Sequence, residues 1–146
     1  MTSQYGHKVT KTHTRSVPSA LIREELPIKP KLSRHCLATI IVEDQAKLYD
    51  SKGFVTAIRA ILDNETVQCI GEVTHEFQNR SFSSVLALAE SHISVHTWPE
   101  RFSVQLDVFL CNYMHDNTQK SERIFEAIIA YFGPVSEIER THVDRL

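Results

Sequence analysis

The stretch ESHISVHTWPE, residues 90–100, gathers two histidines, two serines, a tryptophan and two glutamates into eleven positions. At Glu90-Ser91 a hydroxyl stands beside a peptide carbonyl, and His96 offers an imidazole that exchanges protons near neutral pH. Cys111 follows Ser91 by twenty positions and offers a thiol. Each residue type is more often structural than catalytic when taken alone. Their combination favours nucleophilic and acid–base chemistry.

The elements that must position these residues follow from the hydrophobic pattern. β-branched or alternating apolar segments predict strands, and apolar residues at helical spacing predict helices. The expected strands are 35–43, 66–77, 81–91, 93–98, 102–111 and 135–143, and the expected helices are 51–64 and 117–133. Ser51 is the expected N-cap of the first helix, and Gly133 followed by Pro134 is expected to end the second. This order predicts an α+β fold, an antiparallel sheet with two helices on one face. The uncovered face predicts a homodimer.

Composition bounds the class of protein. The chain has 146 residues with 42% hydrophobic content, which suits one domain. We find no run of 18 apolar residues and no hydrophobic segment after the first basic residues, so we expect no membrane span and no secretory signal, and a cytoplasmic protein. Three cysteines without CxxC spacing predict free thiols, not a zinc site.

Charge is distributed unevenly along the chain. Residues 1–34 hold seven Lys/Arg and two Asp/Glu, a net +5, which leaves −7 of the total −2 for the remainder. Ser, Thr and Pro dilute the basic residues, and no aromatic residues are interleaved with them, so nucleic-acid binding is not expected. We interpret residues 1–33 as a polar, flexible extension and 34–146 as the single functional domain.

With these elements placed, the motifs resemble the prokaryotic S-adenosylmethionine decarboxylase proenzyme family. The resemblance spans about residues 35–142 and includes ESHISVHTWPE and LDVFLC. Its further matches are Arg34-His35 at the first strand, His75 and Phe77 in an HxF motif, and Ser83.

The resemblance implies that the chain cuts itself between Glu90 and Ser91, giving a β chain of residues 1–90 and an α chain of residues 91–146. The Ser91 hydroxyl would attack the Glu90 carbonyl and form an ester, an acyl shift that needs a strained peptide and donors for the oxyanion. His96, expected across a strand turn from Ser91, would remove the Cα proton of Ser91, and Ser83 would hydrogen-bond the intermediate. Elimination and hydrolysis would convert Ser91 into a covalent pyruvoyl cofactor.

The resemblance also implies the later chemistry. The pyruvoyl ketone would condense with a substrate amine as a Schiff base and accept the electron pair when CO2 leaves. Cys111 is implied as the acid that reprotonates the substrate carbon. Phe77 would stack on adenine, Glu100 would hold the ribose hydroxyls, and Trp98 would lie at the rim of the substrate site. The product would supply the aminopropyl donor for polyamine synthesis.

Several positions depart from the family pattern. Asn79-Arg80-Ser81 replaces the usual Pro-x-Gly turn, and Thr39, Phe102 and Arg140-Thr141 replace an acidic residue, a glycine and an Arg-Gly pair. These changes alter turns beside the implied substrate pocket, so the substrate could differ. The main alternative is a pyruvoyl-dependent arginine or ornithine decarboxylase.

Two further hypotheses have less support. A non-catalytic interaction partner would have lost the serine, histidine or cysteine, and all three are present. A metal site formed by His92, His96 and Cys111 lacks a fourth ligand, so no metal is predicted, and His92 is expected to shape the processing turn. No residue of the sequence indicates whether the enzyme is activated by a polyamine, by Mg²⁺ or by neither.

Overall fold

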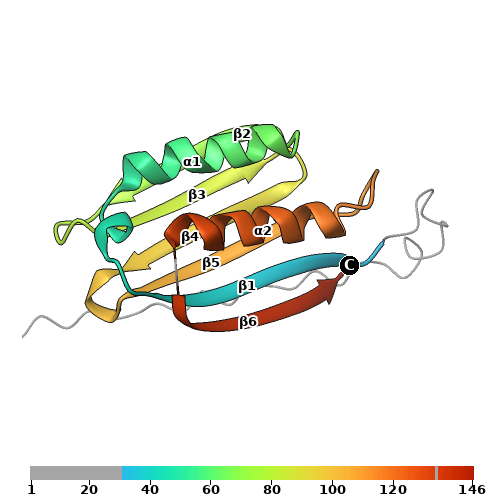
Figure 1. Cartoon of the computed structure of the whole chain (residues 1–146). Coiled ribbons are helices and arrows are strands. Elements are labelled where there is room, and N and C mark those ends of the chain that lie inside the picture. The colour runs from blue at the N-terminus through green and yellow to red at the C-terminus, as the bar shows by residue number, and fades with distance from the viewer. Residues whose placement is uncertain (1–30, 134) are drawn as a thin grey trace, which may run out of the picture.

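Period-two alternation of apolar side chains builds one antiparallel sheet, and two amphipathic helices cover one of its faces (Figure 1). The computed structural model describes residues 31–133 and 135–146. Its strands are β1 (Ser33–Val42), β2 (Cys69–Glu76), β3 (Phe82–Leu88), β4 (Ser91–Trp98), β5 (Ser103–Leu110) and β6 (Val135–Arg145). Its α-helices are α1 (Ser51–Asn64) and α2 (Thr118–Phe132), and short 3-10 helices span Ala46–Leu48 and Pro99–Arg101.

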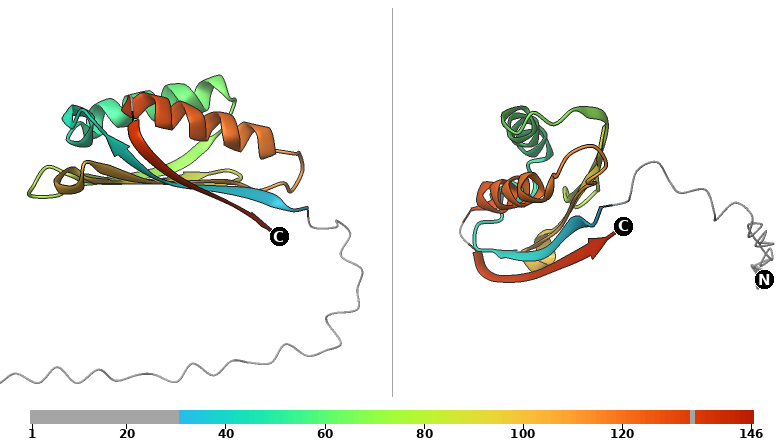
Figure 2. Two further views of the ribbon diagram at one scale, coloured as in Figure 1. Left: turned by 60° about the horizontal axis from the view of Figure 1, so that its bottom comes forward. Right: turned by 90° about the vertical axis from the view of Figure 1, so that its right-hand side faces the viewer.

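The six strands lie in the order β2-β3-β4-β5-β1-β6, and every neighbouring pair is antiparallel. Both helices lie on the same side of the sheet, as the two views of Figure 2 show. The predicted α+β fold is therefore confirmed. The order places β4, which carries Ser91, His96 and Trp98, and β5, which Cys111 directly follows, at the centre of the sheet.

The core lies between the helices and the sheet. In β1, Cys36, Ala38, Ile40 and Val42 are buried, while the alternate side chains are half-buried. From the helices, Phe54, Ile58 and Leu62 of α1 and Ile124, Phe125, Ile128 and Phe132 of α2 complete the core. The opposite face of the sheet, which we call the outer face, includes Val73 and Val85, which are 71% and 45% exposed.

The helix ends match the expected bounds closely, with one correction. Asp50, not Ser51, caps α1, since its carboxylate accepts the Gly53 N–H at 2.8 Å. Gly133 ends α2 as expected and has a φ of 89°, a conformation that glycine adopts without strain.

Three other details differ from the expected pattern. The third and fourth strands meet at a tight turn, Ala89-Glu90, so β3 ends at Leu88 and β4 begins at Ser91. Phe102 was expected to start a strand face, but it follows the second 3-10 helix with a left-handed φ of 52°. The sequence offered no periodicity for a 3-10 helix, because such helices here are only three residues long.

Most of the predicted extension lies outside the described residues. Ser33, its last residue, begins β1. No helix within residues 31–133 and 135–146 is both long and apolar enough to cross a membrane.

Candidate active site

The turn between β3 and β4 holds the predicted cleavage site. Ser91 opens β4 with a φ of 138°, although it carries a side chain. Residues other than glycine in this region of conformational space are strained by about 1–3 kcal/mol, and such strain concentrates at functional sites. The peptide bond expected to break is thus attached to a strained residue.

The carbonyl of Glu90 has a donor aimed at it. The backbone N–H of Cys111 donates to the Glu90 oxygen with an N···O distance of 2.9 Å. Negative charge would develop on this oxygen if the Ser91 hydroxyl attacked the carbonyl carbon. Cys111, directly after β5, would therefore supply one donor for that charge.

Asn117, which the sequence analysis did not single out, fixes both sides of this turn. Its side chain is buried at the start of α2, and its amide donates to Glu90 Oε2 at 3.0 Å and to the Cys111 carbonyl at 2.8 Å. Its backbone N–H donates to Asn112 Oδ1 at 2.6 Å. The only sequence signal was an asparagine at an expected helix start, which is common at caps and not specific to a site.

A network of hydrogen bonds and one longer ion-pair contact runs from Ser91 across the outer face. Ser91 Oγ lies 3.2 Å from His92 Nδ1, and His92 Nε2 lies 3.5 Å from Asp107 Oδ1. Asp107 Oδ1 also lies 2.5 Å from His35 Nε2, and Arg145 donates to His35 Nδ1 at 3.3 Å. Of these partners the sequence analysis named only His35 and His92, since the register of β1, β4 and β5 is needed to bring them together.

The ligand atoms of His35, His92 and Asp107 lie within 4.8 Å of one another, a separation that a metal ion could bridge. The short His35–Asp107 contact and the guanidinium of Arg145 beside His35 favour a network of hydrogen bonds over a bound metal ion at these three residues. His96, four residues after His92 on the same extended strand, is about 13 Å along the strand from it. The metal trio considered from the sequence, His92 with His96 and Cys111, is therefore not brought together.

The remaining predicted residues form a second group at the far end of β4. A pocket of about 380 Å³ is lined there by Phe77, Asn79, Ser81, Ser83, His96, Thr97, Trp98 and Glu100. The Ser83 hydroxyl lies 2.7 Å from His96 Nδ1, because these two residues are directly paired between β3 and β4. Phe77 follows β2 and is 48% exposed, so its ring is free for contact. All three predicted substrate residues thus line one pocket.

The two groups are far apart within one chain. His96 lies five positions after Ser91 along β4, which is about 16 Å in an extended strand. The expected strand turn between them is wrong, since β4 pairs without a break with β3 on one side and β5 on the other. A turn there would break both sets of backbone hydrogen bonds.

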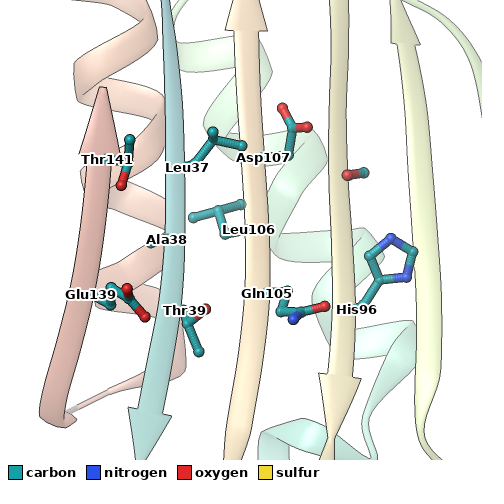
Figure 3. Close-up of a pocket in the computed structure, with 10 residues that line it drawn as sticks. Leu37, Ala38, Thr39, His96, Gln105, Leu106, Asp107, Glu139 and Thr141 are labelled. Carbon is teal, nitrogen blue, oxygen red and sulfur yellow. The ribbon is translucent and has the colours of Figure 1, made fainter. Parts of the chain in front are cut away.

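A groove of about 480 Å³ lies on the outer face between the two groups, and His96 and Asp107 both line it. Figure 3 shows Thr39, Gln105, Glu139 and Thr141 along the same groove, on β1, β5 and β6. Leu37, Ala38 and Leu106 also line it, so the groove presents both polar and apolar side chains and is open to solvent.

Two of the departures from the family pattern fall on turns with left-handed backbone. Arg80, in the turn after β2, and Phe102 have φ of 66° and 52°. The Arg80 guanidinium lies over the Tyr49 ring at 5.8 Å, and Arg80 does not line the pocket that contains Phe77 and Glu100. The positive charge of Arg80 therefore lies outside the lining of that pocket.

Residues 34–146 match the model of the S-adenosylmethionine decarboxylase family. A protein of Archaeoglobus fulgidus named S-adenosylmethionine decarboxylase proenzyme is 28% identical over 105 residues, 72% of this chain and 90% of that protein. One of the same name from Pyrococcus abyssi is 43% identical over 65 residues, 44% of this chain and 47% of that protein.

A solved structure is similar over most of its length. The crystal structure of the adenosylmethionine decarboxylase from Aquifex aeolicus superposes with a TM-score of 0.69 at 26% sequence identity. The match covers 80% of this chain and 92% of that chain. The part of the chain that it leaves out is comparable in size to the predicted extension.

Proposed function

The chain belongs to the S-adenosylmethionine decarboxylase family, and we propose that it is a self-cleaving, pyruvoyl-dependent enzyme that decarboxylates S-adenosylmethionine for polyamine synthesis. The observation that carries this proposal is the geometry at the Glu90-Ser91 peptide, where the turn meets β4. A serine with a φ of 138° follows a carbonyl whose oxygen already accepts the Cys111 N–H. These features suit attack of the serine hydroxyl on the preceding carbonyl.

The residues at this turn fit the formation of a pyruvoyl group from Ser91. Attack would move the Glu90 acyl group from nitrogen to oxygen, relieve the backbone strain and leave an ester. When formed, a pyruvoyl group supplies a ketone that accepts the electron pair released with CO2. Cys111, half-buried at the end of β5, is the proposed proton donor to the substrate carbon.

The second half of the site is proposed to come from a second copy of the chain. His96 and Ser83 are too far from Ser91 in one chain to act on it. The outer face that carries them is incompletely covered, with exposed valines on β2 and β3. A homodimer formed through the outer faces would bury these side chains and bring His96 of one copy to Ser91 of the other. In that arrangement, His96 would remove the Cα proton of Ser91 from the ester.

The pocket beside His96 is the proposed substrate site. Phe77 would stack on the adenine ring, Glu100 would accept from the ribose hydroxyls, and Trp98 would close the rim. The Trp98 ring is held by the Arg101 guanidinium at 5.1 Å from its centroid and by a hydrogen bond to Gln105 at 3.3 Å. A simple basic amino acid would need neither an aromatic stack nor a ribose contact, so S-adenosylmethionine is favoured over arginine and ornithine.

The chemistry is proposed to reside in residues 34–146, the range that the family model matches. Deletion of residues 1–30 should leave cleavage and decarboxylation intact. Failure of the shortened chain to fold would show that the extension packs against the domain or the dimer interface.

The test of cleavage is the intact mass of the purified chain. We expect two chains, the smaller being residues 91–146 with a ketone-reactive N-terminus, and we expect Ser91→Ala to stay uncut and inactive. A wild-type chain that stays whole after prolonged incubation contradicts the proposal.

The test of substrate is kcat/KM for S-adenosylmethionine, arginine and ornithine. A ring stack and a charge-assisted ribose contact together contribute about 2–4 kcal/mol, so Phe77→Ala with Glu100→Gln should reduce S-adenosylmethionine turnover roughly 30- to 1000-fold. Glu43→Gln, at an exposed site, is the matched control. Preference of the wild type for arginine or ornithine would contradict the assignment.

A further inference from the structure

The network from Ser91 to Arg145 assigns a proton acceptor for the first step of self-cleavage. This step is the removal of the hydroxyl proton from Ser91 while Oγ attacks the Glu90 carbonyl. His96 is about 16 Å away along β4 in the same chain. His92 Nδ1 lies 3.2 Å from Ser91 Oγ, within hydrogen-bond reach.

The direction of each hydrogen bond follows from Arg145, because a guanidinium only donates. Arg145 lies 3.3 Å from His35 Nδ1, so a neutral His35 accepts there and carries its proton on Nε2. His35 Nε2 then donates to Asp107 Oδ1 at 2.5 Å. Arg145 itself is held by its stack on the Phe109 ring at 4.6 Å.

The same carboxylate oxygen orients His92. His92 Nε2 faces Asp107 Oδ1 at 3.5 Å, which favours the tautomer with the proton on Nε2. Nδ1 of that tautomer carries a lone pair and can accept from the Ser91 hydroxyl. A nucleophile, an imidazole and a buried or half-buried carboxylate in this order form a general-base arrangement.

We propose that His92 is the general base of the N-to-O acyl shift, and that Asp107 is the residue that positions it. This inference rests on the proposed function. The Ser91 hydroxyl proton passes to His92 Nδ1 as Oγ forms a bond to the Glu90 carbon. The electron pair of the carbonyl moves onto the Glu90 oxygen, which accepts the Cys111 N–H.

Collapse of this intermediate breaks the bond between the Glu90 carbon and the Ser91 nitrogen. The nitrogen takes the proton back from His92, so the products are an ester and a free amino group. No other reactant is needed, and His92 returns to its starting form. His92 thus acts before the ester exists, whereas His96 is proposed to act on the ester.

The experiment follows cleavage of full-length chains made in a cell-free system, with and without hydroxylamine, which cuts esters and spares peptide bonds. We compare wild type, His92→Asn, His92→Ala, Asp107→Asn and His96→Ala. The asparagine amide keeps a hydrogen-bond acceptor near the Nδ1 position but is no base. His115→Asn, at an exposed site, is the matched control.

We expect His92→Asn to slow cleavage at least about 100-fold and to leave a chain that hydroxylamine does not cut. His96→Ala should instead accumulate a chain that hydroxylamine does cut. Free imidazole should restore cleavage to His92→Ala, which no purely structural role of His92 would permit. Asp107→Asn should slow cleavage roughly 10- to 100-fold, since it acts through His92.

Two results would overturn the inference. Cleavage of His92→Asn within about threefold of wild type would show that no base is needed there, since a base contributes about 100-fold or more. Accumulation of an ester in His92→Asn would show that the residue acts later. A wild-type chain that stays whole and resists hydroxylamine would instead refute the proposed function, and this inference with it.

Discussion

Removal of the Asn117 amide tests how the fold holds the cleavage turn. The side chain is 1% exposed and donates to Glu90 Oε2 and to the Cys111 carbonyl. It makes no capping hydrogen bond of its own, so Asn117→Ala leaves the helix cap largely unchanged. The loss is confined to one hydrogen bond to a charged group and one to a neutral group.

These two hydrogen bonds set the expected magnitude. A bond to a charged group contributes about 1.5–3 kcal/mol and a neutral one about 0.5–1.5 kcal/mol, so Asn117→Ala should reduce the free energy of unfolding by about 2–4 kcal/mol. The half-buried Cys111 carbonyl would be left without this donor. Ser91→Ala is the background for both chains, so that cleavage does not complicate the measurement.

The assay is urea unfolding followed by the fluorescence of Trp98, the single tryptophan of the chain. Asn64→Ala, at the exposed end of α1, is the matched control and should change the free energy by no more than about 0.5 kcal/mol. A similarly small effect of Asn117→Ala would refute the assigned role. With Ser91 present, Asn117→Ala should also slow cleavage on the order of 100-fold through misplacement of the turn.

Three other changes test separate parts of the chain. Cys111→Ala should still be cut but should lose most decarboxylation or inactivate with turnover; near wild-type kinetics would refute its role as the acid. Burial raises the pKa of the Cys36 thiol to about 11, so iodoacetamide at neutral pH should label the exposed Cys69 first and Cys36 only after unfolding, as peptide mass spectrometry would show. The Arg123 guanidinium, hydrogen-bonded to Glu65, lowers the pKa of that carboxyl, so the pair stabilises the fold above the unfolded pKa of Glu65 and loses this effect as the pH falls through the lower folded value. Arg123→Gln should therefore lower the urea midpoint slightly at neutral pH and not in strong acid; an equal loss at both would contradict the ion pair.

The local structure was largely predictable from the sequence. The 51–64 helix was expected at its observed bounds, and its buried face follows from the spacing of Phe54, Ile58 and Leu62. The family was also evident, since its motif around Ser91 is a continuous stretch of residues. These features depend only on residues that are adjacent in the chain and on the spacing of the apolar side chains.

The bounds at the cleavage turn were not predictable to the residue. Residues 81–91 were expected as one strand, because LALAES contains no glycine or proline to mark a turn. The structure turns there at Ala89-Glu90 and places the strain on Ser91. A hydrophobic pattern cannot signal a backbone strain that neighbouring strands impose.

The sequence by itself supplied the groups proposed for the chemistry: a serine after a glutamate, the histidine His96, a cysteine, and an aromatic and a carboxylate for a substrate. The tertiary structure decided which of them meet. Strand order and register place Asp107 beside His92, the start of α2 places Asn117 beside Glu90, and the unbroken extension of β4 separates His96 from Ser91. The pairing of strands brings together residues that are far apart in the chain, and the extended strand keeps apart residues that are close in it. Both effects depend on the packing of the whole sheet and not on local sequence.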